Sequence, residues 1–221
     1  MVGARYWADT PLITTALLGG SFNPAHRGHK HISMNARLAL NLDEVWWLVS
    51  PGNPLKQAAK DMAPLTIRLR SAQRAARRSP IKATAIEQHL NTRYTVDTLR
   101  KIVRLYPNRR FIWVMGADNL AQFHHWKEWR KIAKMMPIAV FARPGYNDAA
   151  RAAPAMSWFR QFVRPVNQSK HWTKWRTPAL VHLRFRPDKT SATALRRADP
   201  DWQRDFSPHP VRDSITRRMI T

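Results

Sequence analysis

The stretch LITTALLGGSFNPAHRGHKHISMNARLAL, residues 12–40, decides the fold. Residues 12–20 form an apolar run that ends in two glycines, which is typical of a buried strand. From residue 27 onward apolar side chains recur at helical spacing, so we expect a helix over 27–40. Its apolar face comprises Ile32, Ala36, Ala39 and Leu40. The order strand, glycine turn, helix predicts the first unit of an α/β protein.

The same alternation continues to about residue 197. Further strands are expected at 43–51, 81–87, 109–118, 137–145 and 179–186, and further helices at 66–79, 94–106 and 126–136. In the second of these helices the expected apolar stripe is Val96, Leu99, Ile102 and Val103. Repeated β–α alternation predicts a doubly wound parallel sheet, in which ligands bind beyond the carboxyl ends of the strands.

Two segments depart from the alternation. Residues 146–178 are rich in proline, tryptophan and basic residues, and we expect them to form a variable connection. A helix start is expected at 190–197, followed by a polar stretch. The predicted organisation is therefore one domain over 1–198 and a solvated, polar C-terminal tail over 199–221.

Composition narrows the class of protein. The chain has 221 residues, 44% of them apolar, which is enough for a sizeable core. It has no cysteine, which excludes disulfides and thiolate metal sites and is compatible with a reducing cytoplasm. No apolar run approaches the roughly 20 residues that cross a bilayer, and the first residues do not have the pattern of a signal peptide. We therefore expect a cytoplasmic protein with no membrane partner.

The formal charge of +24 is spread along the whole chain. A positive field attracts nucleotides, polyphosphates and nucleic acids alike, so charge alone does not decide among them. Together with ten tryptophans it keeps open a basic nucleic-acid-binding protein, since bases stack on aromatic rings in basic grooves. Many of the tryptophans, however, fall on the buried faces of expected strands, namely Trp46 or Trp47 and Trp113.

The turn between the first strand and helix has the residues of a polyphosphate cradle. Gly19 and Gly20 let the backbone turn and approach a ligand closely. The helix start that follows offers N–H groups and a favourable dipole to an anion. His26 and His29 lie three apart, on one face of the first turn, where imidazoles can donate to phosphate oxygens. Two surface histidines, or a zinc site without evident further ligands, are the alternatives.

At this point the sequence resembles a known family. GGSFNPAHRGH, residues 19–29, is similar to the signature of the HxGH nucleotidyltransferase superfamily, and SATALR, residues 191–196, is similar to its C-terminal (I)SxTxxR motif. MGADNLAQFHHWKEWRKI (115–132) and FARPGY (141–146) resemble the bacterial nicotinate-mononucleotide adenylyltransferases more narrowly. The resemblance covers about residues 12–197 and implies a Rossmann-like nucleotidyltransferase fold.

The resemblance implies adenylyl transfer from ATP to nicotinate mononucleotide, with release of pyrophosphate. The attacking phosphate is already an anion, so catalysis would rest on positioning and charge stabilisation. His26, His29 and Arg196 would be the catalytic residues. The ATP site implied by the resemblance comprises Gly19, Gly20, Ser21, Phe22, His26, His29, Gly116, Asp118, Ser191, Thr193 and Arg196. ATP also implies Mg²⁺, expected to be held mainly by the phosphates and water.

The resemblance likewise implies a site for the mononucleotide. It comprises Asn53, Lys56, Tyr94, Thr95, Trp126 and Arg143. The nicotinate ring would stack on Trp126, with backbone amides near Tyr94 and Thr95 contacting its carboxylate. Trp126 taken alone would more often be a core residue of an amphipathic helix.

Some positions depart from the family pattern. Asn23 stands where Asp is also common, Thr190 where Ile is more usual, and Ala192 in place of a second Ser. None of these removes a group that the chemistry needs. The alternatives are another HxGH nucleotidyltransferase, such as phosphopantetheine adenylyltransferase, and the nucleic-acid-binding protein. Nucleic-acid binding also stays open as a secondary property, and the sequence does not determine the oligomeric state.

Overall fold

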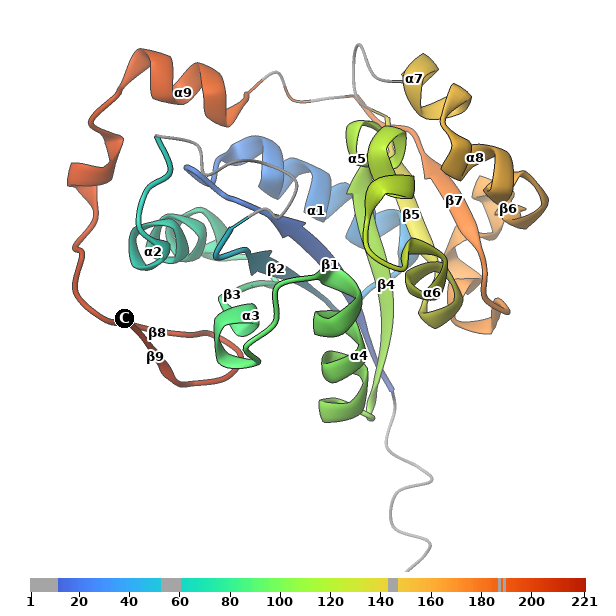
Figure 1. Cartoon of the computed structure of the whole chain (residues 1–221), viewed down its shortest axis with the longest axis horizontal. Coiled ribbons are helices and arrows are strands. Elements are labelled where there is room, and N and C mark those ends of the chain that lie inside the picture. Colours follow the sequence, from blue (N-terminus) through green and yellow to red (C-terminus); the bar gives the residue numbers. More distant parts are fainter. Residues whose placement is uncertain (1–11, 53–60, 143–146, 187, 189) are drawn as a thin grey trace, which may run out of the picture.

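The computed structural model describes residues 12–52, 61–142, 147–186, 188 and 190–221. Its centre is a seven-stranded sheet in the order β3-β2-β1-β4-β5-β7-β6, and every neighbouring pair is parallel (Figure 1). The strands are β1 Ile13–Gly20, β2 Glu44–Val49, β3 Ile81–Thr84, β4 Arg109–Gly116, β5 Ile138–Phe141, β6 Val163–Arg164 and β7 Leu180–Leu183. The doubly wound parallel sheet is confirmed.

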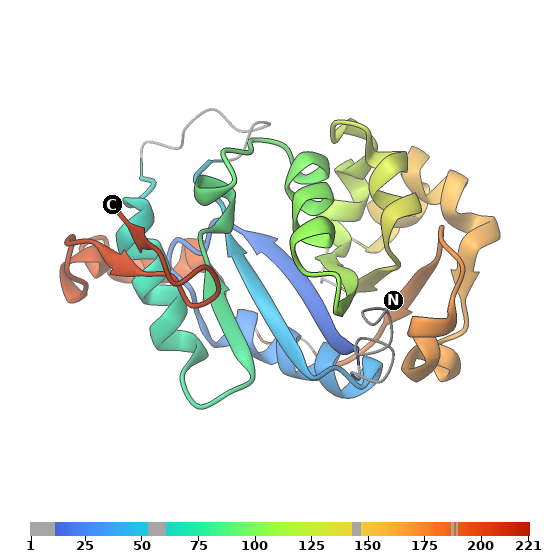
Figure 2. The same ribbon diagram turned by 90° about the horizontal axis from the view of Figure 1, so that it is seen from below.

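Helices cover both faces of this sheet (Figures 1 and 2). The α-helices are α1 Arg27–Leu40, α2 Leu65–Ala76, α3 Ile86–His89, α4 Thr95–Leu105, α5 Ala117–Gln122, α6 Trp129–Met135, α7 Asn147–Ala152, α8 Pro154–Phe159 and α9 Ala192–Ala198. Short 3₁₀ helices lie at η1 Phe123–His125, η2 Arg160–Phe162, η3 Val166–Lys174 and η4 Trp202–Asp205.

Two cores form because alternate residues of each strand point to opposite faces. Leu18 and Trp47 pack with α1 and α2 on one face, whereas Leu17 and Trp46 pack with α4, α5, α6 and α8 on the other. Because both faces are buried, the strands are apolar at nearly every position. Trp46, Trp47 and Trp113 are all buried, as expected.

Several local expectations were wrong. The strand expected over 109–118 ends at Gly116, directly before α5, and the helix expected over 66–79 ends at Ala76. The strand expected over 81–87 ends at Thr84, and α3 follows at once. Val103 is 38% exposed, while Val96, Leu99 and Ile102 are buried, so the stripe of α4 is narrower than expected. α6 begins at Trp129, because Trp126 has extended backbone angles and Glu128 a left-handed φ of 50°, neither of which continues a helix.

The segment between β5 and β7 adds structure to the edge of the sheet. It forms α7, α8, the edge strand β6 and η3. Trp172 of η3 is buried, and its indole N–H donates to the carbonyl of Leu40 at 2.9 Å. Part of the tryptophan enrichment in this segment therefore serves the core.

The expectation of a solvated C-terminal tail was wrong. Residues 199–221 form η4 and a hairpin, β8 Val211–Arg212 with β9 Met219–Ile220, beside α2 and β3 (Figure 2). Trp202, Val211 and Ile220 are buried, and so is Asp213. The Asp213 carboxylate accepts hydrogen bonds from the Thr84 hydroxyl and from the Ala85 amide, so the tail closes one end of the domain.

The strand order reverses at the centre of the sheet. β1 and β4 are neighbours, while the chain proceeds outward from β1 through β2 to β3 and outward from β4 through β5 to β7. Such a switch point leaves a crevice beyond the carboxyl ends of the two strands, where open α/β sheets bind ligands. The pairing of β1 with β4 ends at Leu18 and Val114. Gly20 and Gly116 lie two residues further along their strands. The sequence motifs are thus placed at this edge.

Candidate active site

Packing leaves little room for a side chain at either of the two glycines that end β1. A Cβ on Gly19 would lie 2.8 Å from the Trp113 ring, and a Cβ on Gly20 would lie 3.2 Å from the ring of Phe22. Phe22 has a left-handed φ of 48° and stacks on Trp47 with 5.0 Å between ring centroids. Its side chain is buried, so it can contribute to a nucleotide site through its backbone and by supporting its neighbours.

The paired histidines form the start of α1. His26 is the N-cap, and its Nδ1 accepts a hydrogen bond from the Gly28 amide at 3.1 Å. The His29 Nδ1 accepts from the His26 amide at 3.2 Å, and the two rings lie 3.9 Å apart between centroids. An imidazole that accepts at Nδ1 carries its proton at Nε2 and donates there. Each ring therefore presents a donor of the kind a phosphate oxygen needs.

Gly28 lets the C-terminal segment approach this helix start. A Cβ at this position would lie 2.9 Å from the His26 ring and 3.0 Å from the carbonyl oxygen of Thr190. Arg27 Nε also donates to the Thr190 hydroxyl at 3.2 Å and pairs with Asp188 at 2.9 Å. At Gly28, the glycine of the HxGH motif, the start of α1 therefore contacts the C-terminal segment that contains Thr190.

Arg196 makes the closest link between the two motifs. It lies on α9, and its Nη1 donates to the carbonyl of Asn23 at 2.7 Å. Its Nε donates to Asp61 Oδ2 at 2.6 Å. The structure therefore brings Arg196 to the loop that carries His26 and His29.

The other residues of the C-terminal motif occupy the start of α9. Ser191 is its N-cap, with Oγ accepting from the Ala194 amide at 3.1 Å. Thr193 is exposed in the first turn. Ser191 thus has a helix-capping role in the structure, and Thr193 faces solvent.

The hydrogen bonds of Asn23 explain why this chain has Asn at a position where Asp is also common in the family. Its Nδ2 donates to the Asp61 carbonyl at 2.9 Å, and its Oδ1 accepts from the Ala63 amide at 3.1 Å. A carboxylate could not donate the first of these bonds. Asn23 therefore joins the loop after β1 to the residues before α2.

The carboxyl end of β4 carries the next predicted pair. A Cβ on Gly116 would overlap the Asp118 carboxylate and lie 3.2 Å from the Phe141 ring. Asp118 is partly buried in the first turn of α5. Only glycine at 116 permits this position of Asp118, at the switch point of the sheet.

The residues predicted for the nicotinate ring lie at the start of α4 and between η1 and α6. Tyr94 precedes α4 and Thr95 begins it. Trp126 is partly buried and packs edge-on against Trp113 and Phe123, with centroids 6.2 and 5.2 Å apart. Lys127 Nζ lies 4.5 Å from the centre of the Tyr94 ring. The structure thus places the segment that carries Trp126 beside the start of α4.

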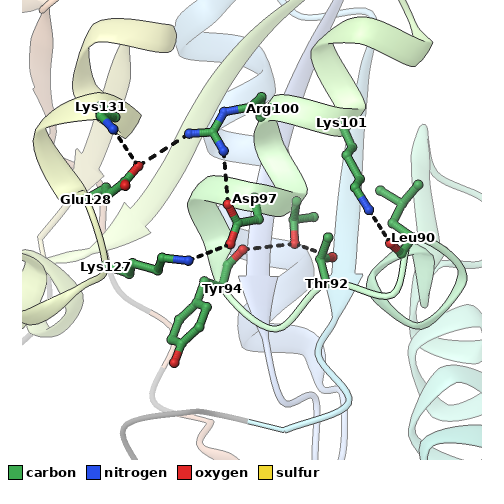
Figure 3. Close-up of polar contacts among 10 residues, drawn as sticks. Leu90, Thr92, Tyr94, Asp97, Arg100, Lys101, Lys127, Glu128 and Lys131 are labelled. Carbon is green, nitrogen blue, oxygen red and sulfur yellow. Dashed lines mark hydrogen bonds and ion pairs between the residues drawn. The ribbon is translucent and has the colours of Figure 1, made fainter.

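Ion pairs hold these two elements together (Figure 3). Asp97 of α4 pairs with Lys127 at 3.1 Å and with Arg100 at 3.0 Å. Arg100 reaches Glu128 at 3.4 Å, and Lys131 pairs with Glu128 at 3.1 Å. The pairs that join the two elements, Arg100–Glu128 and Lys127–Asp97, were not predicted from the sequence, because their partners are 28 and 30 residues apart.

Two ionisable groups at the same edge, Glu87, which is partly buried, and Arg68, which is buried, were not predicted from the sequence. Burial raises the pKa of Glu87, on α3, to about 7, and a hydrogen bond from the Ser50 hydroxyl opposes this rise. Burial lowers the pKa of Arg68, on α2, to about 10. A charged residue on the apolar face of a predicted helix was the available signal for Arg68.

Three predicted residues, Asn53, Lys56 and Arg143, lie outside the described residues. Within the described ranges, no group of three or more His, Asp or Glu side chains is placed to hold a metal ion. The helices in those ranges are all too short or too polar to cross a membrane.

Comparison with known proteins identifies the family. A family model described as "Cytidylyltransferase-like" matches residues 17–198. A curated protein of Erythrobacter litoralis named "Probable nicotinate-nucleotide adenylyltransferase" is 58% identical over 94% of this chain and 94% of its own. One of the same name from Parvibaculum lavamentivorans is 46% identical over 87% of this chain and 96% of its own.

A solved structure agrees with this assignment at the level of the fold. It is titled "Plasmodium falciparum nicotinic acid mononucleotide adenylyltransferase complexed with NaAD" and superposes with a TM-score of 0.60, covering 84% of this chain and 83% of that one at 16% identity. The sheet with its switch point, the joined HxGH and SATALR motifs and these relatives lead to one conclusion. The chain belongs to the nicotinate-nucleotide adenylyltransferase family of the cytidylyltransferase-like nucleotidyltransferases.

Proposed function

We propose that this protein transfers the adenylyl group of ATP to nicotinate mononucleotide, as the names of its relatives indicate. A phosphate oxygen of the mononucleotide attacks the α-phosphorus of ATP and forms a new P–O bond. The bond from the α-phosphorus to the α,β-bridging oxygen breaks, and pyrophosphate leaves with that electron pair. The products are deamido-NAD and pyrophosphate, in a step of NAD biosynthesis.

One observation carries this proposal most directly. Arg196, from near the end of the domain, donates to the carbonyl of Asn23 in the loop that leads to His26 and His29. This hydrogen bond joins two motifs more than 160 residues apart beside the start of α1. Donors fixed before the reaction stabilise charge that develops on phosphoryl oxygens, which is the main requirement of this chemistry.

The proposed roles follow from the positions of the side chains. His26 and His29 donate from Nε2 to the triphosphate, and the first amides of α1 add the positive end of the helix dipole. Arg196 faces the same loop from α9. The backbone of Gly19–Phe22, together with Gly116, Asp118, Ser191 and Thr193, completes the proposed ATP site.

For the acceptor we propose the surface between α4 and the segment around Trp126. The nicotinate ring stacks on Trp126, and the amides at the start of α4, near Tyr94 and Thr95, contact its carboxylate. We keep Asn53, Lys56 and Arg143 as proposed contacts of the mononucleotide.

Mg²⁺ is usual in enzymes that use ATP, because it offsets charge on the phosphate oxygens. Since the described residues offer no protein cluster for an ion, we propose that the phosphates and water hold it. The protein's contribution is to bind and orient the phosphates around it. The cysteine-free sequence suits a reducing compartment, and we propose the cytoplasm as the place of action.

The test is pyrophosphate release from ATP and Mg²⁺ with three acceptors: nicotinate mononucleotide, its amide and phosphopantetheine. We expect turnover with the first. Turnover with phosphopantetheine alone would favour the sibling enzyme, and no turnover with any acceptor would refute the transferase reaction.

The same assay tests the proposed role of His29. His29→Ala should lower kcat at least about 100-fold, because a donor to the transition state is lost. His171→Ala, in an exposed histidine of η3, is the matched control and should change kcat little. A near-normal rate for His29→Ala would exclude the phosphate role.

A further inference from the structure

Arg68 is the largest charged side chain in the interior of the described structure. It is 2% exposed and lies on the face of α2 that also carries Leu69 and Ala72. Arginine at such a position is rare, since burying a charge is costly unless its donors are satisfied. Its partners therefore indicate why it is there.

Among the described residues, the guanidinium donates only to backbone carbonyls, and these carbonyls come from three segments. Nε donates to Ala63 at 2.8 Å, and Nη1 donates to Ser21 at 2.8 Å and to Ser50 at 2.6 Å. Nη2 donates to Pro51 at 3.3 Å. One planar group thus holds the residues directly after β1, those directly after β2 and the residue that leads into α2.

The two strand ends it joins belong to the two halves of the site. Ser21 lies in the loop with His26 and His29, where we place the triphosphate. Ser50 and Pro51 begin the loop in which we place contacts to the mononucleotide phosphate. One turn further along α2, the Ser71 hydroxyl accepts from the Ala25 amide at 3.1 Å, so the same helix face holds the first loop twice.

Arg68 also brings a positive charge that no described carboxylate pairs with. Burial lowers its pKa only to about 10, so the group stays charged at neutral pH. Backbone carbonyls accept from four of its five N–H groups, but they do not neutralise its net charge. An anion bound beyond the two strand ends is attracted by this charge, and the low-dielectric surroundings weaken that attraction less than water would.

From this geometry we propose that Arg68 is a positioning residue. It fixes the loop after β1 relative to the loop after β2, so that the attacking phosphate and the α-phosphorus are held in line. This inference rests on the adenylyl transfer proposed above. Arg68 is proposed to act through these loops and not as a catalytic residue, because four of its five N–H groups donate to backbone carbonyls.

Two variants separate geometry from charge. Arg68→Lys keeps the charge but cannot reach carbonyls of all three segments from a single ammonium. Arg68→Met removes the charge with an unbranched side chain that adapts to irregular space. Both should lower kcat about 10- to 100-fold, the effect of a small misplacement of reacting groups, with the KM values for both substrates changed less than about threefold.

Arg70→Lys is the matched control on the same helix. Arg70 also donates to backbone carbonyls, those of His209 and Pro210 at 3.2 and 3.0 Å, but these lie in the C-terminal tail. Its kcat should stay within about twofold of wild type. The melting temperature of each variant shows that the protein assayed is folded.

Amide hydrogen exchange supplies a readout that does not depend on the reaction. In the Arg68 variants, exchange should become faster in residues 20–25 and 50–52 together, while the Arg70 variant keeps wild-type rates there. A normal kcat in a folded Arg68 variant, or unchanged exchange at both loops, overturns the proposal. Absence of turnover in the wild type refutes the transferase reaction instead and leaves the exchange result to decide about Arg68.

Discussion

At the scale of single residues, Glu87 illustrates how burial changes chemistry. Its carboxyl lies on α3 with the Ser50 hydroxyl as a hydrogen-bond donor, and its carbonyl accepts from the Thr92 amide at 3.0 Å. Removal from water disfavours the carboxylate and raises its pKa from 4.5 to about 7. The sequence offered no sign of this, because Glu87 is followed by polar residues typical of a surface turn.

The raised pKa predicts how stability depends on pH. A folded-state pKa above the unfolded value means that the group's contribution is greatest below pH 4.5, falls between pH 4.5 and 7, and stays at its lower value above that. Glu87→Gln removes the penalty of burying the charge. Its gain in Tm over wild type should be larger at pH 8 than at pH 5, by about 2–4 °C, measured by calorimetry.

Glu128→Gln is the control, because the pKa of the Glu128 carboxyl is shifted in the opposite direction. A hydrogen bond from Lys131 and the attraction of nearby cations lower the pKa of the Glu128 carboxyl, so its contribution is present at pH 8. This variant should gain nothing at pH 8. If the Tm difference between Glu87→Gln and wild type is the same at both pH values, the Glu87 carboxyl titrates normally in the folded protein.

At the scale of elements, the proposed acceptor site depends on how α4 lies against residues 126–128. Asp97 connects the two by bonding both Lys127 and Arg100, and Arg100 continues to Glu128 (Figure 3). These side chains are partly exposed, so each pair contributes little to stability. Their effect should appear in the position of Trp126 relative to Tyr94.

Asp97→Asn should therefore raise the KM for the mononucleotide by about two- to fivefold, the range of an exposed ion pair, and leave the KM for ATP unchanged. Steady-state kinetics with each substrate varied in turn measures both. Asp201→Asn, which breaks a pair with Arg204 at 3.0 Å on η4, is the matched control. Equal increases in both KM values would show that Asp97 acts on the whole site.

Elements with a long apolar pattern were predicted well from the sequence. The helix expected over 27–40 has those bounds, and the strand expected over 12–20 begins one residue later. Errors fall where tertiary contacts override the local pattern. The helical spacing of WKEWRKIA continues through Trp126, yet the Trp126 ring packs on Trp113 and Phe123, and α6 starts only at Trp129.

At the scale of the molecule, the C-terminal residues complete the fold. Asp213 is fully buried, and besides Thr84 and Ala85 it accepts from the amides of Ile215 and Thr216 at 2.8 and 2.9 Å. One carboxylate thus shapes the turn of the hairpin and fastens it to the end of β3. Gln73 of α2 adds a bond to the carbonyl of Arg212 at 2.8 Å.

Asp213→Ala should lower the free energy of unfolding by about 2–3 kcal/mol, because several buried donors lose their acceptor. Urea denaturation measures this. Asp205→Ala, which removes an exposed pair with Arg74 at 3.6 Å, should cost less than about 0.5 kcal/mol. Similar small losses in both variants would mean that the tail is only loosely attached.

The sequence by itself determined the α/β class, the parallel sheet and the motifs of the site. Those features follow from short-range patterns: alternating strands and helices, glycines before a helix start, histidines three apart. The resemblance added the C-terminal SATALR motif, and the comparisons confirmed the family.

Only the tertiary structure decided how these parts meet. It showed that Arg196 donates to the carbonyl of Asn23, that Arg68 joins two strand ends, and that Asp213 attaches the C-terminal hairpin to the residue after β3. Each contact joins a side chain to backbone groups that are distant along the chain, and a backbone carbonyl looks the same at every residue of a sequence. The physical reason is that a hydrogen bond between a side chain and a distant backbone group leaves no local pattern in the sequence. Apolar burial and helix starts do leave such a pattern.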